Sequence, residues 1–246
     1  MIQLTLVQID NYGPWTTNPE PKKESYLQEL QADIYRTLQK KFSKNKALLT
    51  PMRFDNMIAI TNGMTEKQHR SIMKQVNKKF PVSISMSIAT GETPYEAQAK
   101  ATEQLTAEGG AKHSHRKAVL KTTGTINNDV KIAHIDINSI TKHTDSNVYD
   151  SYERVVEVQK SLIKNLGKTG ALVFFMGGDN FIAPCDGTSK KELVEALIKV
   201  EEETGVMLKA GIGIGKSAEE AVHNASLGLK EIRQGAKEKV IGKNAG

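Results

Sequence analysis

Two aspartates in the second half of the sequence, Asp136 and Asp179, could together hold a metal ion. Asp136 follows an apolar run, and Asp179 lies in Gly177-Gly178-Asp179-Asn180 between two further apolar runs. Apolar runs separated by glycine-containing turn residues predict a β-hairpin with this aspartate at its tip. Such an aspartate could equally be an ordinary turn residue that faces water. The metal-binding interpretation therefore depends on whether the fold brings Asp136 beside it.

The rest of the chain limits which metal such a pair could hold. Cys185 is the only cysteine, so a cysteine-ligated zinc site is excluded and the ligands must be oxygen or imidazole groups. Two close carboxylates repel each other unless a proton or a cation lies between them. Oxygen ligands favour Mg²⁺, which completes its shell with waters and substrate phosphate oxygens and can activate a nucleophile. We therefore expect Asp136 and Asp179 to be catalytic and to bind Mg²⁺, with the carbonyl group of Ile137 as a further ligand.

Neighbouring residues could bind the phosphates of a substrate. The main-chain N–H groups of Asn138 and Ser139 follow the strand that contains Asp136, and successive N–H groups can form an anion-binding concavity. Lys209 lies on a later predicted strand and could neutralise phosphate charge, although a single strand lysine is also common at a surface. Asn180 is a further expected substrate contact, and it could equally be a turn-forming residue.

The sequence repeats itself, and the repeat brings a second pair of aspartates. Asp10 and Asp136 are 126 positions apart, and Asp55 and Asp179 are 124 positions apart. A third pair of similar segments, also 124 positions apart, comprises residues 87–91 and 211–215. Three similar segments in one order at nearly one offset indicate an internal duplication. On this basis Asp10 corresponds to Asp136, and Asp55 corresponds to Asp179.

The elements that must position these residues follow one order in both halves. Apolar periodicities and capping signals predict a strand, a helix, a hairpin, a helix, a strand and a helix. In the first half these elements are residues 2–9, 23–42, 47–54 with 57–61, 66–79, 82–88 and a helix from residue 93. In the second half they are residues 130–135, 148–166, 171–176 with 180–183, 189–204, 206–214 and a helix from residue 217.

This order predicts an α+β fold of two tandem ferredoxin-like βαββαβ domains, each an antiparallel sheet with two helices on one face. The right-handed crossover makes the first two strands of each domain parallel and puts the third strand between them. The end of the first strand then lies beside the tip of the hairpin. The fold is therefore expected to pair Asp136 with Asp179, and Asp10 with Asp55.

Glycine- and asparagine-rich composition separates the two halves. We place one domain at residues 1–108, a linker at 109–129 with a short helix around 117–121, and a second domain at 130–246. The polar residues after about position 234 are expected to fray.

The first-half pair has three open interpretations. Asp10 and Asp55 could form a second metal site, could be a relic of the duplication, or could accept the ring N–H and amino group of a guanine base. In the last case the nucleotide pocket would be completed by Asn11, Tyr12, Trp15 and Arg53. Trp15, the only tryptophan, could instead pack in the core or anchor a loop.

Three histidines are candidates for proton transfer or metal binding. His113 and His115 lie in the predicted linker, where we expect a solvent-exposed loop. His134 lies on the strand that leads to Asp136, so we expect its ring to pack, with proton transfer as the alternative.

The segments Ile135-Asp136-Ile137-Asn138 and Gly177-Gly178-Asp179-Asn180 resemble the palm-type catalytic core of nucleotidyl cyclases, diguanylate cyclases and polymerases. The Gly-Gly-Asp-Glu-Phe signature of diguanylate cyclases is matched in part, because Asn180 stands where that family has glutamate. The first acid of the signature, Asp179, is kept. The resemblance therefore implies metal binding and argues against cyclase activity.

A second resemblance extends over nearly the whole chain. The sequence resembles the archaeal GTP cyclohydrolase III family in residues 8–16, 53–56, 92–98, 133–138 and 209–215. This resemblance implies two tandem palm-like domains and an enzyme that opens the imidazole ring of GTP at carbon 8 while retaining the formyl group. The implied products are 2-amino-5-formylamino-6-ribosylamino-pyrimidinone 5′-phosphate and phosphate, for riboflavin and deazaflavin synthesis. Mg²⁺ is the implied cofactor and a monovalent cation such as K⁺ the implied activator. The alternatives are a cyclase-like enzyme and a non-catalytic nucleotide sensor.

Composition limits the other partners. The net charge of +6 suits an anionic ligand, but 28 acidic residues lie among the basic ones and aromatic residues make up only 5%, so we expect no nucleic-acid partner. No apolar stretch is long enough to span a bilayer, and the first residues do not resemble a leader. We therefore expect a cytoplasmic protein without a membrane partner. Exposed strand edges in small domains also predict a homo-oligomer.

Overall fold

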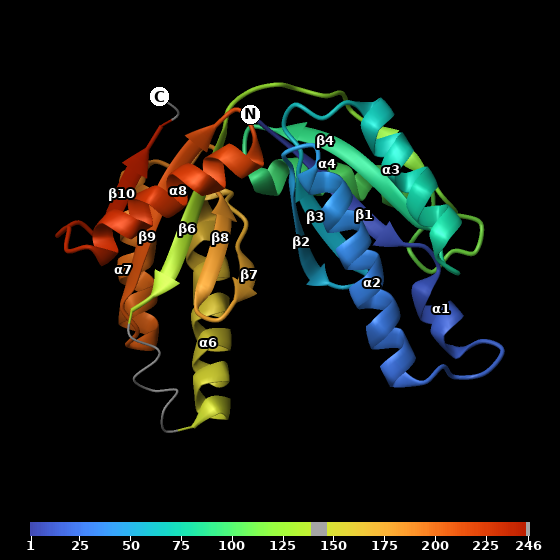
Figure 1. Cartoon of the computed structure of the whole chain (residues 1–246), viewed down its shortest axis with the longest axis horizontal. Coiled ribbons are helices and arrows are strands. Elements are labelled where there is room, and N and C mark those ends of the chain that lie inside the picture. Colours follow the sequence, from blue (N-terminus) through green and yellow to red (C-terminus); the bar gives the residue numbers. More distant parts are fainter. Residues whose placement is uncertain (139–146, 245–246) are drawn as a thin grey trace. The chain divides into compact units, whose positions relative to one another are not determined.

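The structure, a computed structural model, describes residues 1–138 and 147–244. The chain divides into two compact units, each with its own five-stranded sheet (Figure 1). The N-terminal unit comprises Ile2–Gly91 and Glu96–Asn128, and the C-terminal unit comprises Met1, Glu92–Tyr95 and Asp129–Gly246. None of the helices in the described ranges combines the length and apolar character that a membrane crossing requires.

The first half of the chain forms a sheet in the order β2-β3-β1-β4-β5. Its elements are β1 (Ile2–Ile9), α1 (Tyr12–Thr17), α2 (Glu24–Ser43), β2 (Leu48–Arg53), β3 (Asn56–Ile60), α3 (Glu66–Lys79), β4 (Ile84–Gly91), α4 (Pro94–Ala107) and β5 (Leu120–Thr122). Strand β3 is antiparallel to both β1 and β2, so β1 and β2 are parallel to each other, as predicted.

The second half repeats this arrangement, with the strand order β7-β8-β6-β9-β10. Its elements are β6 (Val130–Ile137), α6 (Val148–Leu166), the 3₁₀ turn η1 (Gly167–Thr169), β7 (Phe174–Gly177), β8 (Asn180–Pro184), α7 (Lys190–Thr204), β9 (Leu208–Gly215), α8 (Ala218–Arg233) and β10 (Val240–Lys243). The predicted α+β fold of two tandem ferredoxin-like βαββαβ units is confirmed.

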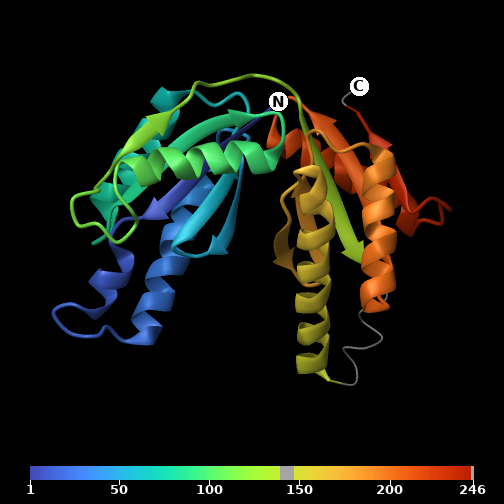
Figure 2. The ribbon, with the colours of Figure 1, turned by 180° about the vertical axis from the view of Figure 1, so that it is seen from behind.

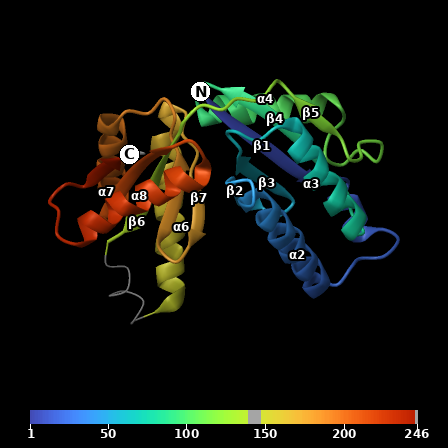
Figure 3. The ribbon, with the colours of Figure 1, turned by 45° about the horizontal axis from the view of Figure 1, so that its top comes forward.

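A fifth strand at the edge of each sheet differs from the expectation. In place of a short helix near residues 117–121, β5 pairs in parallel with β4 (Figure 3). In place of a frayed end, β10 pairs in parallel with β9. Both short strands use backbone groups that the outer strand of a ferredoxin-like sheet leaves unpaired. The duplicated unit therefore includes this fifth strand, and the segment predicted as a linker carries part of it.

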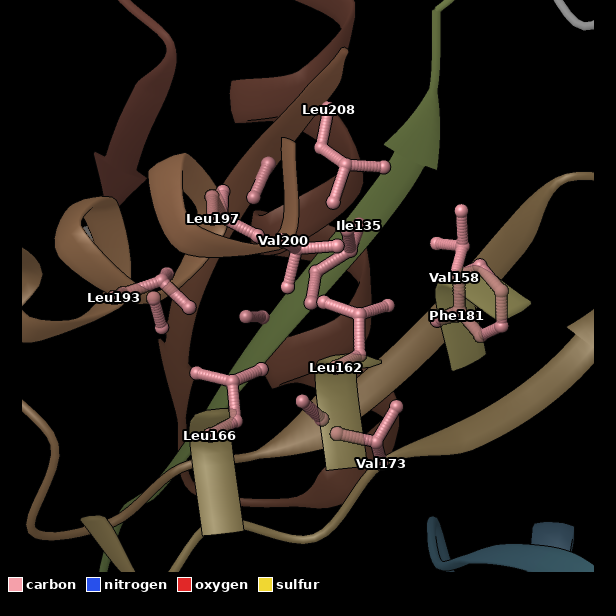
Figure 4. Close-up of a cluster of buried hydrophobic side chains, with 14 of the residues drawn as sticks. Ile135, Val158, Leu162, Leu166, Val173, Phe181, Leu193, Leu197, Val200 and Leu208 are labelled. Atoms are coloured by element: carbon pink, nitrogen blue, oxygen red, sulfur yellow. The ribbon is translucent and has the colours of Figure 1, made fainter. Parts of the chain in front are cut away.

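The core of the C-terminal unit lies between its sheet and two helices. Alternate residues of β6, among them Ile135 and Ile137, contact buried side chains of α6 and α7 (Figure 4). Leu162 and Leu166 of α6 and Leu197 of α7 are fully buried there. Helices α6 and α7 cover this face because each presents an apolar stripe at helical spacing.

Helix α8 covers the opposite face of the same sheet. It passes in front of the sheet in Figure 1, whereas α6 and α7 lie in front in Figure 2. Two glycines of β9 permit its close approach: a Cβ atom on Gly211 would lie 1.8 Å from the carbonyl oxygen of Ala225, and one on Gly213 would lie 2.0 Å from that of Ala221. The glycine-rich segment at residues 211–215 is therefore a helix-packing surface. This packing places the C-terminal end of α8 against the sheet.

The N-terminal unit has the same two faces. Helices α2 and α3 pack on one face around the buried Ile34, Leu38 and Val76. Helix α4 lies on the other face (Figure 2). There the hydroxyl group of Ser87 on β4 donates a hydrogen bond to the side chain of Gln104 on α4 at 2.7 Å.

Strand register corrects one predicted equivalence. Asn56 and Asn180 are 124 positions apart, yet they pair with Gln8 and Asp136, which are 128 positions apart. The pairs Gln8 with Ser85 and Asp136 with Lys209 give the same result. Asp136 therefore corresponds to Gln8, and the predicted equivalence with Asp10 is wrong by two residues. A shift of two keeps the same face of the strand, which is why the side-chain alternation did not reveal it.

Candidate active site

Strand alternation in β6 directs two polar side chains to the face that α8 covers. Ile135 and Ile137 belong to the core, so His134 and Asp136 lie on the opposite face. Asp136 is 3% exposed. Lys209 is its partner in the register of β6 with β9, and the lysine Nζ lies 3.0 Å from Asp136 Oδ2. Strand pairing thus places a lysine on the predicted metal-binding carboxylate.

A second cation, Arg233, reaches the same carboxylate oxygen from the last turn of α8. Its Nη2 lies 3.0 Å and its Nε 3.3 Å from Asp136 Oδ2. Arg233 is absent from the residues predicted from the sequence. The one signal was a basic residue in the last turn of a predicted helix, and such residues are usually attributed to the helix dipole. Two cations on one oxygen make this end of the sheet attractive to an anion.

The other oxygen of Asp136 has no partner in the part of the chain that the structure describes. Oδ1 is buried and accepts no hydrogen bond within the described residues. A buried charged oxygen without a partner is costly, and a cation would remove that cost. No group of three or more His, Cys, Asp or Glu side chains gathers anywhere in the described ranges, so water and substrate oxygens would have to complete a metal shell. That is the usual situation for Mg²⁺, and the donor set therefore fits this ion.

Asp179 lies at the hairpin tip beside the end of β6. Its carbonyl oxygen accepts a hydrogen bond from the N–H group of Ile137 at 3.2 Å. Its carboxylate accepts a hydrogen bond from Asn180 Nδ2 at 2.7 Å, and Asn180 faces Asp136 in the register of β6 with β8. Positive φ angles at Gly177-Gly178 make the turn. The fold thus brings the two predicted ligands to the same end of the sheet.

The main-chain N–H groups that were expected to bind phosphate are not both available for it. The N–H group of Asn138 donates to the carbonyl oxygen of Met207 at 2.9 Å, so it is already used, which the sequence did not indicate. Ser139 lies outside the described residues. The cationic groups of Lys209 and Arg233 remain as the groups suited to phosphate.

His134 packs between α8 and the hairpin. Its Nε2 lies 2.9 Å from Asn180 Oδ1, and its Nδ1 lies 3.0 Å from Ser226 Oγ. Burial lowers the pKa of His134, although the hydrogen bond with Asn180 acts in the opposite direction. The expectation that this ring packs is therefore confirmed.

The N-terminal unit lacks most of these groups at equivalent positions. Gln8 stands in the place of Asp136, and Ser85 in that of Lys209. Counting 124 positions back from Arg233 leads to Gly109. The hairpin pair of aspartate and asparagine, Asp55 and Asn56, is kept, and Arg116 donates a hydrogen bond to Gln8 at 2.8 Å. The arrangement of carboxylate and cations thus belongs to the C-terminal unit.

Asp10 is surrounded by donors of its own unit. The hydroxyl groups of Ser83 and Ser85 donate to its two carboxylate oxygens at 2.8 Å and 2.6 Å. The N–H group of Ala118 donates at 2.9 Å, and Arg116 Nε lies 3.3 Å away, with both charged side chains buried. These contacts favour a structural role. Metal or base binding by Asp10 and Asp55 stays a prediction.

Of the other residues of the predicted base pocket, Asn11, Tyr12 and Trp15 lie near one another, whereas Arg53 pairs with Asp55. A cavity of about 170 Å³ is lined in part by Asn11, Trp15 and Arg116, whereas Tyr12 and Arg53 are not among its lining residues. Trp15 packs against the core, and the ring of Tyr12 stacks on it with 6.0 Å between the ring centroids. This is what the loop-anchor interpretation predicts. Arg53 Nη2 lies 3.0 Å from Asp55 Oδ2.

The linker histidines, His113 and His115, are exposed, in agreement with the expected solvent-exposed loop.

Comparison with known proteins gives one consistent result. The family model described as GTP cyclohydrolase III matches residues 1–244. The chain is 48% identical to the GTP cyclohydrolase III of Methanobrevibacter smithii, over 95% of this chain and 94% of that protein. It is 47% identical to that of Methanothermobacter thermautotrophicus, over 96% of both.

Among solved structures, the active GGEEF domain of a diguanylate cyclase from Vibrio cholerae is similar to 48% of this chain and 85% of that one, at 13% identity and a TM-score of 0.40. The family match covers both units and every residue of the site described above. The chain belongs to the GTP cyclohydrolase III family.

Proposed function

We propose that this protein is a GTP cyclohydrolase that opens the imidazole ring of GTP at carbon 8 and retains the formyl group. The products would be 2-amino-5-formylamino-6-ribosylamino-pyrimidinone 5′-phosphate and phosphate. One observation carries the assignment of the site: one oxygen of Asp136 contacts two cations, and its other, buried oxygen has no partner among the residues that the structure describes. That arrangement suits a metal ion and a triphosphate together.

The carboxylates would hold the metal. Asp136 and Asp179, with the carbonyl group of Ile137, would supply the oxygen donors, and the strand register and the hydrogen bond from Ile137 N–H to the Asp179 carbonyl support this by placing both aspartates at one end of the sheet. Bound Mg²⁺ would polarise phosphate oxygens and activate water for attack. K⁺ would act as an additional activator. The hairpin tip offers one carboxylate, because Asn180 stands beside Asp179.

Lys209 and Arg233 would hold the triphosphate. Both now share Asp136 Oδ2, at 3.0 Å each. Guanidinium and ammonium groups bind phosphate strongly, and a guanidinium can do so with two parallel hydrogen bonds. A metal that neutralises Asp136 would weaken its hold on both cations and leave them for phosphate oxygens.

The test is the fate of the purine ring. Incubation with GTP and Mg²⁺ should replace the purine absorbance spectrum with that of a formylaminopyrimidine and release phosphate, and chelation of Mg²⁺ should abolish both. Release of pyrophosphate with an intact purine would instead indicate a cyclase. Binding of GTP without turnover by folded protein would indicate a sensor. Either result would contradict the proposal.

The remaining partners stay predictions. Exposed apolar side chains on or beside the edge strands β2 and β7 support a homo-oligomer: Met52, Phe54, Phe175 and Met176. Such edges commonly pair with another chain. A cytoplasmic location and the absence of a nucleic-acid partner likewise stay expectations.

A further inference from the structure

A chain of hydrogen bonds connects helix α8 to the carboxylate at the hairpin tip. Ser226 Oγ lies 3.0 Å from His134 Nδ1, and His134 Nε2 lies 2.9 Å from Asn180 Oδ1. Asn180 Nδ2 then lies 2.7 Å from Asp179 Oδ1. The chain thus runs through His134, which lies on β6 on the same face as Asp136.

The direction of these hydrogen bonds follows from donor and acceptor types. An ionised carboxylate only accepts, so the amide nitrogen of Asn180 must face Asp179. The amide oxygen of Asn180 then faces His134, which requires a proton on Nε2. This holds for the neutral ring protonated at Nε2 and for the doubly protonated ring. A neutral ring protonated at Nδ1 would set a nitrogen lone pair against the amide oxygen.

The N-terminal unit lacks this chain. Counting back by the strand offset of 128, the counterpart of His134 is Leu6. There Gln8 Nε2 donates to Asn56 Oδ1 at 2.7 Å, and Asp55 is held by Arg53. The histidine therefore occurs in the unit in which Asp136 has two cationic partners and an oxygen that no described residue contacts by a hydrogen bond.

We propose that His134 is a positioning residue: its Nε2–H fixes the amide of Asn180 in the orientation that donates to Asp179, and so holds this carboxylate ready for a metal ion. The inference rests on the proposed function, which makes Asp179 a metal ligand. Without the Nε2 donor, the amide can turn its oxygen towards Asp179 and repel it. Loss of a group that orients a metal ligand typically lowers metal affinity by about 10–100-fold.

Two measurements test this without GTP turnover, so they are independent of ring opening. The first is ¹⁵N NMR of the unchanged protein, which should show His134 protonated at Nε2. The second is Mn²⁺ binding, measured by electron paramagnetic resonance, in a matched pair of variants. His134→Gln keeps an N–H donor near the Nε2 position, whereas His134→Asn ends near the Nδ1 position. We expect His134→Asn to lower Mn²⁺ affinity by about 10-fold or more, and His134→Gln to retain most of it.

Each other outcome would overturn the proposal. These outcomes are a neutral ring protonated at Nδ1, unchanged affinity in a folded His134→Asn variant, equal loss in both variants, or no Mn²⁺ binding by the unchanged protein. Circular dichroism verifies that the variants are folded. Should His134→Asn fail to fold, the NMR result on the unchanged protein still decides whether Nε2 is the donor. A positive metal result without ring opening would contradict only the proposed reaction.

Discussion

Asp10 and Asp136 occur in similar sequence contexts, but their carboxylates have different partners in the structure. Both are buried, but Asp10 accepts hydrogen bonds from two serines and one backbone N–H group and lies beside Arg116, all in its own unit. Asp136 has two cations on one oxygen and, within residues 1–138 and 147–244, no partner on the other. A buried charge must be compensated. The protein compensates Asp10 fully, and leaves a position at Asp136 that a ligand can fill.

Asp10→Asn should destabilise the N-terminal unit without changing the Mg²⁺ requirement. The variant leaves Arg116 buried without its ion-pair partner and offers an amide nitrogen to groups that donate hydrogen bonds. Breaking a buried pair in this way typically costs about 3–5 kcal/mol. Urea unfolding measures the loss, and the Mg²⁺ concentration for half-maximal ring opening measures the requirement. A stable variant that needs much more Mg²⁺ would show that Asp10 is a metal ligand.

At the scale of the elements, the packing of α8 on β9 assembles the site. Arg233 and Ser226 reach β6 only because α8 lies directly on the glycines of β9. A glycine removes the Cβ atom that would otherwise hold a helix away from a strand. The glycine-rich segment therefore acts on the chemistry indirectly, through the helix that it admits.

Gly213→Ala tests this role of the packing. The added Cβ would lie 2.0 Å from the carbonyl oxygen of Ala221 and 2.3 Å from the nitrogen of Ala225, both backbone atoms. We expect the C-terminal unit to lose about 3 kcal/mol or more of unfolding free energy, measured in urea. Gly167→Ala is the matched control, since a Cβ there meets nothing within 4 Å. Equal stability of the two variants would contradict the packing argument.

Most elements were predictable because their signals are local. Helix α3 has its predicted bounds, Glu66–Lys79, since Thr65 and Gln68 form a capping box at its start. Strands β5 and β10 were not predictable, because three or four residues carry little pattern and the partner strand decides their state. Register and the reach of Arg233 depend on pairing and helix packing between distant segments. The predicted pair Asp136 and Asp179 followed from topology, whereas its cation Arg233 did not.

At the scale of the whole chain, one fold occurs twice and the two copies differ in their polar groups. Both units have the same strand order and a hairpin aspartate followed by asparagine. The C-terminal unit has Asp136, Lys209 and Arg233 around that end of its sheet. The N-terminal unit has Gln8 and Ser85 at the corresponding strand positions. Duplication thus preserved the architecture, and we assign the proposed chemistry to the second copy.

The most direct test of this assignment compares the two equivalent hairpin aspartates. Asp179→Asn and Asp55→Asn make the same change at the same position of the two units, and the rate of Mg²⁺-dependent ring opening of GTP is the measurement. We expect Asp179→Asn to lower kcat by about 100-fold or more, in the range seen when a group that stabilises the transition state is removed, and Asp55→Asn to stay within a few-fold of the unchanged protein. Equal losses, or the greater loss in Asp55→Asn, would contradict the central claim that the C-terminal unit carries the active site.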